Sequence, residues 1–146
     1  MDKTNTAKVE IAAITGNRLA VERMADGLNA TTSVCHGLAA KSGWWTDKKT
    51  GERLALDQIN VAEKLCLIHS EVSEAMEGHR KNLNDDKLPH RKMLEVELAD
   101  ALIRIHDLAG FLGLDLAGAT VEKLAFNQQR PDHKMENRLK EGGKAF

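Results

Sequence analysis

Two pairs of acidic residues with the same spacing, Glu71-x-x-Glu74 and Glu97-x-x-Asp100, are the residues of this chain best suited to chemistry. Residues three apart in a helix lie on one face, with Cβ atoms roughly 5–6 Å apart. Two helices packed through these faces would bring four negative charges together, and such charges repel one another unless cations neutralise them. Mg²⁺ prefers oxygen ligands and keeps waters that a phosphate can replace. The spacing therefore predicts a magnesium site, with Mn²⁺ as a substitute.

The neighbours of these acids distinguish them from ordinary helix acids, which face water. Apolar residues lie one helical turn from them: Leu67, Ile68 and Ala75 from Glu71, Met93, Leu94 and Ala101 from Glu97, and Val96 and Ile103 from Asp100. By contrast, Glu77 and Glu95 are expected to face solvent. We therefore expect the paired acids to border the core.

Two other kinds of metal site fit the sequence poorly. A di-iron helical bundle normally carries a Glu-x-x-His on each of two helices, and this chain has no such motif. An EF-hand would need alternating Asp or Asn ligands around a central Gly, and these are missing too. His69 and His106 are accordingly interpreted as partly buried polar residues.

The elements that must position the acids are helices, since apolar residues recur at helical spacing and alternating patterns are nearly missing. We expect helices over residues 17–41, 56–79, 90–112 and 115–129, with Gly113 and Pro131 as stops and Asp115 as a cap. The second helix is expected to place one stripe in the core: Val61, Leu65, Ile68, Val72 and Met76. The prediction is an all-α bundle of four to five helices with an antiparallel two-helix metal-binding core.

Length and composition restrict the function classes. The 146 residues suit a single domain over 1–146, with residues 1–10 and 132–146 expected to be flexible. A net charge of -1, from 21 basic and 22 acidic residues, argues against nucleic acid as a partner. The two cysteines, Cys35 and Cys66, suit a reducing compartment, and no apolar run approaches the ~20 residues of a membrane span. We expect a cytoplasmic protein without a membrane partner.

Several segments occur in the order and at the spacing typical of one family: KSGWW, LIHSEVSEAMEGHR, ELADALIRIHDLAGFLGLDL and KLAFNQQRP. Together with the acid pairs, they make residues 28–134 resemble the MazG-like, all-α nucleoside triphosphate pyrophosphohydrolases, in particular their short phage-type or integron-type members. The C-terminus departs from that pattern. Family members often place His-Gly-Lys soon after the Arg-Pro, whereas here an insertion separates Lys134 from Gly143-Lys144.

The resemblance implies Mg²⁺-dependent hydrolysis of nucleoside triphosphates between the α and β phosphorus atoms, giving the monophosphate and pyrophosphate. It implies Glu71, Glu74, Glu97 and Asp100 as metal ligands. It also implies that Glu71, or else Glu74, takes the proton of the attacking water. Such proteins are dimers or dimers of dimers, so a homodimer or homotetramer is expected. The expected substrates are dNTPs or damaged nucleotides, whose removal is a house-cleaning role.

Outside the metal ligands, substrate contacts are expected from three places. Lys123, Asn127 and Arg130 follow at i, i+4 and i+7, which is either a phosphate-binding face or a solvated one. Trp44 or Trp45 could stack on the nucleobase near His36, or pack over the end of the bundle. The remaining candidates are Lys81 near Glu74, Arg104 one turn beyond Asp100, and Lys134 and Lys144 in the tail.

Other functions stay open on the sequence. Within the same fold, the enzyme could be specific for dUTP and dCTP, or it could hydrolyse phosphoribosyl-ATP. Outside enzymes, the chain could be a metal-binding helical dimer with a regulatory or structural role.

Overall fold

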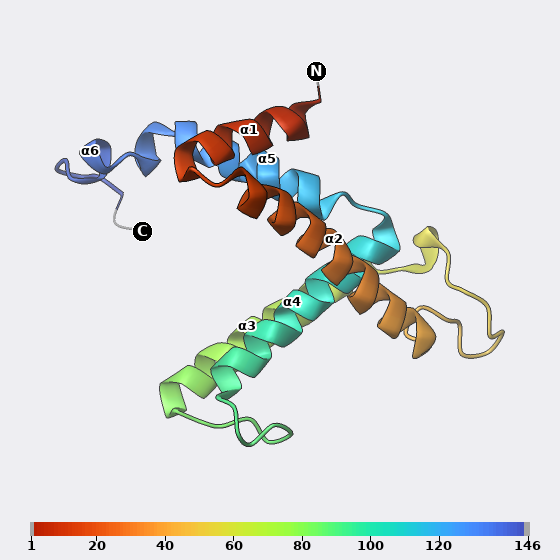
Figure 1. Ribbon diagram of the computed structural model, residues 1–146. Coiled ribbons are helices and arrows are strands. Elements are labelled where there is room, and N and C mark those ends of the chain that lie inside the picture. The colour runs from red at the N-terminus through yellow and green to blue at the C-terminus, as the bar shows by residue number, and fades with distance from the viewer. Residues whose placement is uncertain (1, 145–146) are drawn as a thin grey trace. The chain divides into compact units, whose positions relative to one another are not determined.

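The computed structural model describes residues 2–144, and their regular secondary structure is helical (Figure 1). Among these residues there are six α-helices: α1 Lys3–Thr15, α2 Arg18–Lys41, α3 Val61–Lys81, α4 Met93–Leu112, α5 Leu116–Gln129 and α6 Met135–Arg138. Two 3₁₀ turns, η1 Leu56–Gln58 and η2 Pro131–His133, accompany them. The only strand-like pairings in this part of the chain are isolated bridges. The all-α prediction is confirmed, with more helices than the four or five expected.

Capping residues set the helix ends. The side chain of Asn60 accepts from the amide of Glu63 at 3.2 Å, so α3 begins at Val61 and not at the predicted residue 56. Asp115 caps α5 as expected, accepting from Gly118 N at 2.8 Å. Gly113 ends α4 with a φ of 67°, a left-handed conformation that favours glycine. The long helices of the sequence prediction are thus confirmed, with shifted starts.

The chain folds into two compact units, and each is described by itself. The first contains residues 1–30 and 115–146, and the second contains residues 31–114. The boundary at residue 30 falls within α2, so the first half of α2 belongs to one unit and its second half to the other. The prediction of a single domain over 1–146 stays a prediction.

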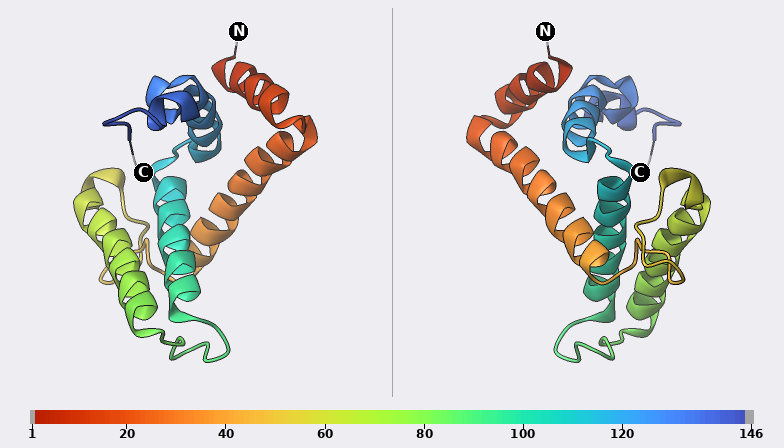
Figure 2. Two further views of the ribbon diagram at one scale, coloured as in Figure 1. Left: turned by 90° about the vertical axis from the view of Figure 1, so that its left-hand side faces the viewer. Right: turned by 90° about the vertical axis from the view of Figure 1, so that its right-hand side faces the viewer.

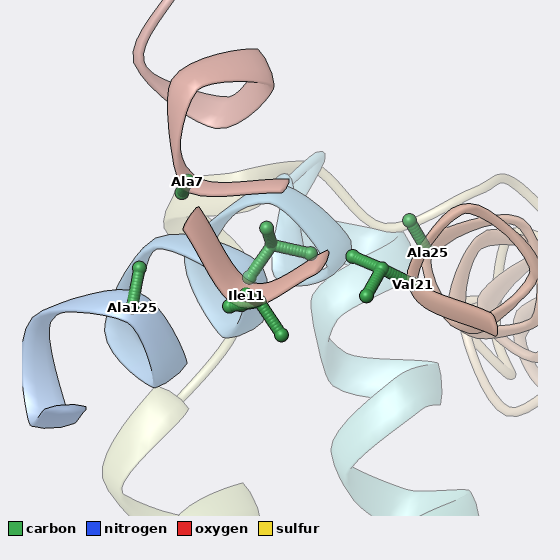
Figure 3. Close-up of a cluster of buried hydrophobic side chains, with 6 residues drawn as sticks. Ala7, Ile11, Val21, Ala25 and Ala125 are labelled. Atoms are coloured by element: carbon green, nitrogen blue, oxygen red, sulfur yellow. The ribbon is translucent and has the colours of Figure 1, made fainter. Parts of the chain in front are cut away.

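In the first unit, α1 packs against α5 over a small apolar core (Figure 3). That core consists of Ala7, Ile11, Val21, Ala25, Val121 and Ala125. Polar contacts also join the two helices, since Thr4 Oγ1 donates to Glu122 Oε1 at 2.6 Å. The sequence analysis did not predict α1 and expected residues 1–10 to be flexible. The sequence of α1 is only weakly amphipathic, so its local pattern does not indicate a helix. Contacts with α5 stabilise it instead.

In the second unit, α3 and α4 lie side by side as an antiparallel hairpin joined by residues 82–92 (Figure 2). The helices approach closely where Gly78 meets Met93, because a Cβ on Gly78 would lie 2.8 Å from Met93 Cβ. In the connecting loop, the carboxylate of Asp85 accepts from the amides of Lys87 and Leu88 at 3.0 and 2.5 Å. The predicted antiparallel pair is therefore present.

The apolar stripe predicted for the core of α3 does not lie in the core of this chain. Val61, Leu65, Val72 and Met76 are exposed, and only Ile68 packs against a buried cluster. The residues of α3 that are buried are Glu71, Ala75 and Gly78. The prediction failed because Glu71 and the small residues Ala75 and Gly78 occupy the buried face of α3, while the large apolar side chains are exposed.

Within residues 2–144, no helix is both long and apolar enough to span a membrane.

Candidate metal centre

Three of the four predicted ligands come together between α3 and α4. Ligand oxygens of Glu71, Glu97 and Asp100 all lie within 4.8 Å of one another. The first comes from α3 and the other two from one face of α4. The helices can approach closely here because the buried neighbours Ala75 and Ala101 are small. The shared spacing of the two acid pairs thus identified a real cluster of carboxylates.

The fourth predicted ligand, Glu74, lies at the margin of this cluster. Its side chain is exposed, and it is outside the group of three whose oxygens converge. Its negative charge nevertheless acts on Glu97 and raises the pKa of that residue. Glu74 is therefore close enough to influence the cluster electrostatically and open enough to reach solvent.

Burial and crowding change the acidity of the cluster. The pKa of Glu97 is raised to about 7, first by burial, then by a hydrogen bond with Glu71 and by the charges of Glu74, Glu71 and Asp100. The pKa of Asp100 is also raised, by burial and by Glu71, although Arg104 opposes that shift. Without a cation, Glu97 in the folded chain therefore keeps its proton to a higher pH than a free glutamate does.

One positive side chain offsets part of this charge. Arg104 Nε lies 2.6 Å from Glu71 Oε1, so the guanidinium joins α4 to the carboxylate on α3. The sequence placed Arg104 beside Asp100, as either an orienting group or a phosphate contact. The structure pairs it with Glu71, while its charge still lowers the pKa of Asp100.

The donor set fits a hard divalent cation. Every converging atom is a carboxylate oxygen, two of the three acids are buried, and one arginine leaves net negative charge. Neutralisation by Mg²⁺ or Mn²⁺ would relieve the repulsion that raises the pKa of Glu97. No histidine or cysteine belongs to the cluster in the described part of the chain, which disfavours softer metals.

A cavity of about 580 Å³ in the second unit adjoins the cluster. Its polar and aromatic lining includes Trp44, Trp45, Lys64, Asp100, Arg104 and Asp107. Trp44 is 69% exposed and Trp45 only 2%, so the two adjacent tryptophans have different environments. Trp45 stacks on Phe111 with ring centroids 4.0 Å apart, which is the packing alternative considered for it. Trp44 remains open for a planar ligand.

The predicted base contact His36 forms part of a polar network beneath this cavity. His36 Nδ1 lies 3.0 Å from Asp107 Oδ1, and Trp45 Nε1 donates to the same oxygen at 2.7 Å. Lys64 Nζ lies 5.0 Å from the centre of the Trp45 ring. The sequence analysis missed Lys64 and Asp107. The position of Asp107, seven residues after Asp100 on the same helix, was a signal that could have identified it.

Lys81, predicted near Glu74, is paired with a different acid. Its ammonium group pairs with Glu77, which also accepts from Arg80 Nη2 at 2.7 Å. These hydrogen bonds lower the pKa of Glu77. In this structure Lys81 is paired with a residue one turn away on the same helix, and its contact with substrate stays a prediction.

The histidines interpreted as partly buried differ from each other. His106 is fully buried, with Nδ1 2.7 Å from Thr32 Oγ1, and burial lowers its pKa. His69 is exposed, so that interpretation is wrong for it.

The remaining predicted substrate contacts belong to the first unit. Lys123 Nζ lies 4.8 Å from the centre of the Phe126 ring. The buried Oδ1 of Asn127 has no hydrogen-bond partner within residues 2–144. Arg130 forms two hydrogen bonds with Asp132, at 2.9 and 2.6 Å.

Two tail lysines complete the set. Lys134 is exposed and precedes α6, and Lys144 Nζ lies 3.6 Å from Asp132. Whether any of these first-unit residues contacts substrate stays a prediction.

In comparisons with protein-family models, curated proteins and solved structures, nothing matches this chain.

Proposed function

We propose that this protein is a Mg²⁺-dependent nucleoside triphosphate pyrophosphohydrolase of the MazG-like kind, which releases a nucleoside monophosphate and pyrophosphate. One observation carries the proposal: carboxylates from two helices converge within 4.8 Å beside a cavity of about 580 Å³. Basic side chains and tryptophans also line this cavity. The motif resemblance supports the same reaction. Cytoplasmic location accompanies the proposal as a prediction.

Glu71, Glu97 and Asp100 would hold the metal, with Glu74 at the margin. A bound Mg²⁺ neutralises phosphate charge and lowers the pKa of a coordinated water, which makes water a competent nucleophile. No nucleophilic side chain is needed for phosphoryl transfer of this kind, because positioning and charge stabilisation supply most of the catalysis.

The cations of the cavity would bind the phosphates. Lys64 and Arg104 both line it, and both belong to the same unit as the carboxylates. Arg104 lies beside Glu71, so it can stabilise phosphate charge next to the metal and also hold that ligand in place. The exposed face of Trp44 provides a stacking surface for the base.

Proton acceptance falls to Glu71 or Glu74. The carboxylate of Glu71 already contacts Arg104 and shares a hydrogen bond with Glu97. Glu74 is exposed and outside the converging group, so it can approach a water without losing another partner. This geometry favours Glu74 as the proton acceptor and Glu71 as a ligand.

A homodimer or homotetramer is part of the proposal. Large apolar side chains of the second unit are exposed along both helices of the hairpin: Leu65, Val72 and Met76 on α3, and Leu98, Leu102 and Ile105 on α4. Their spacing follows one face of each helix. Exposed apolar helix faces are typical of contacts between proteins, and a second copy of the chain would bury them.

The test is a substrate panel. Each NTP and dNTP, and phosphoribosyl-ATP, is incubated with protein and Mg²⁺, and the products are separated. Monophosphate with pyrophosphate is the expected result. Diphosphate with inorganic phosphate, or no turnover of any nucleotide, would contradict the proposal. Metal binding without turnover would instead support a regulatory or structural metal-binding oligomer.

A matched pair of variants connects turnover with the cluster. Glu97→Gln removes a buried ligand, whereas Glu95→Gln changes an exposed acid two residues away. The first variant should lose activity and the second should keep it. Equal activity in the two would exclude the carboxylate cluster as the metal site.

A further inference from the structure

In the described part of the chain, hydrogen-bond partners of Asp107 meet one of its two carboxylate oxygens. Trp45 Nε1 and His36 Nδ1 both contact Oδ1, at 2.7 and 3.0 Å. Within residues 2–144, Oδ2 has no such partner, although an ionised carboxylate can accept about four hydrogen bonds. The side chain is 19% exposed and lines the cavity beside the metal cluster. It therefore offers an acceptor to whatever enters that cavity.

The surroundings of Asp107 hold it firmly. Because a carboxylate only accepts, Nδ1 of His36 is the donor to Asp107, and Nε2 of the same ring lies 3.5 Å from Arg53 Nη2. Gly110 permits the close approach of His36, since a Cβ at Gly110 would lie 2.5 Å from His36 Cβ. Trp45 is fixed by stacking on Phe111. The position of Oδ2 is thus set by groups that ligand binding does not need to move.

Asp107 also lies at a useful distance from the metal cluster. Asp100, Arg104 and Asp107 follow at i, i+4 and i+7, so they share one face of α4, and all three line the cavity. Seven residues of helix rise about 10.5 Å. That length is comparable with the span from the α-phosphate of a nucleotide to the edge of its base. With phosphates near Asp100 and Arg104, the base edge would reach Asp107.

We propose that Asp107 is a specificity residue that accepts a hydrogen bond from an exocyclic amino group of the base. This inference rests on the proposed nucleotide site and names its substrate class. Cytosine presents an amino donor at C4, where uracil and thymine present a carbonyl acceptor. A carboxylate oxygen binds the donor and repels the carbonyl. Amino-bearing bases are therefore substrates, and uracil and thymine nucleotides are disfavoured.

The direct test compares dCTP with dUTP, which differ at this position of the base. The wild-type kcat/KM should favour dCTP by roughly tenfold to a hundredfold, as expected for a hydrogen bond to a charged group. Asp107→Asn keeps one oxygen for Trp45 and His36 and replaces the other with an amide donor. The preference in this variant should fall to near unity or reverse toward dUTP, mainly through KM. An unchanged ratio would overturn the proposal.

A second measurement does not depend on the variant or on turnover. Binding of dCMP, dUMP and 2-pyrimidinone deoxyribonucleoside monophosphate, which lacks the 4-amino group without added bulk, is followed by tryptophan fluorescence. The amino-free analogue should bind wild-type protein more weakly than dCMP, because it lacks the donor, and more tightly than dUMP, because it lacks the repelled carbonyl. If all three bind equally, Asp107 does not recognise the amino group. Failure of hydrolysis with the binding preference intact would contradict only the proposed reaction.

Discussion

The guanidinium of Arg104 on α4 contacts the carboxylate of Glu71 on α3, with Nε 2.6 Å from Oε1. This ion pair is the one cationic contact within the cluster of Glu71, Glu97 and Asp100 among the described residues. It connects the two helices of the hairpin at the level of the converging acids. A single cation leaves the cluster negative, which is the physical condition for binding a divalent metal.

Replacing Arg104 should disturb the arrangement of the carboxylates and weaken the binding of the substrate phosphates. Arg104→Gln leaves the buried Glu71 without its partner and removes a charge that lowers the pKa of Asp100. We expect kcat/KM to fall by ~10²–10³, which is the usual effect of removing one hydrogen-bond donor to the charge that develops in the transition state. Arg104→Lys should recover part of the loss because it keeps the charge. Steady-state kinetics of both variants is the measurement, and wild-type kinetics in Arg104→Gln would contradict the expectation.

The stability of the metal-free protein should decrease as pH rises from about 4.5 to about 7. The pKa of Glu97 is raised from 4.5 to about 7 in the folded state, so in this window the folded chain holds a proton that the unfolded chain has released. Stability then levels off above the folded pKa. Thermal unfolding in EDTA across this pH range measures the effect.

The control for this pH dependence is Glu97→Gln. It removes the titrating group, so its melting temperature should vary less over the same window and exceed that of wild type at pH 8. A pH dependence identical to that of wild type would show that Glu97 is not the responsible group. Glu95→Gln, at an exposed position on the same helix, should behave like wild type.

Glu74→Gln should separate catalysis from metal binding. Because Glu74 lies outside the converging group, the variant should keep most of its affinity for Mg²⁺ while kcat falls by ~10²–10⁴, as on loss of a general base. Metal binding is followed by the rise in melting temperature with Mg²⁺. At a Mg²⁺ concentration a hundred times Kd, bound metal adds about 2.7 kcal/mol to the free energy of unfolding. Loss of that rise would make Glu74 a ligand, and unchanged kcat would exclude it as the base.

Polar substitutions on the exposed apolar face should weaken self-association. Val72→Asp and Leu102→Asp alter side chains that are 49% exposed in the single chain, so neither should disturb the folded hairpin. Sedimentation of wild type should show a dimer or tetramer, and the double variant should sediment as a smaller species. Ser73→Asp, next to Val72 but not apolar, is the matched control. A monomeric wild-type protein would contradict the oligomer proposal.

Sequence reasoning located the carboxylates because their spacing is a local property of helices. The i, i+3 pairs and the caps Asp115 and Gly113 follow from periodicity and backbone conformation, and the structure has them where expected. Helix α1 was not predicted from the sequence, because it is weakly amphipathic and its stability comes from contacts with α5. Such contacts join residues more than a hundred positions apart, which no local window includes.

Partner choice likewise depended on the tertiary structure. Lys81 could have faced Glu74 or Glu77 by spacing alone, and the structure pairs it with Glu77. The role proposed for Asp107 likewise depends on tertiary contacts. The second half of α2 and the Gly-Trp-Trp turn place His36 and Trp45 against one of its carboxylate oxygens.

The sequence by itself determined the helical class, the two pairs of acids and the chemistry that oxygen donors allow, because these depend on residue type and helical repeat. Only the tertiary structure decided which face of α3 is buried, since that depends on which side chains fit against α4. Glu71 and the small residues Ala75 and Gly78 are buried there, and the large apolar residues stay exposed. The same packing leaves Glu74 at the margin of the cluster and places Asp107 in the lining of the cavity, because side-chain volume and partner geometry act between elements and not along the chain.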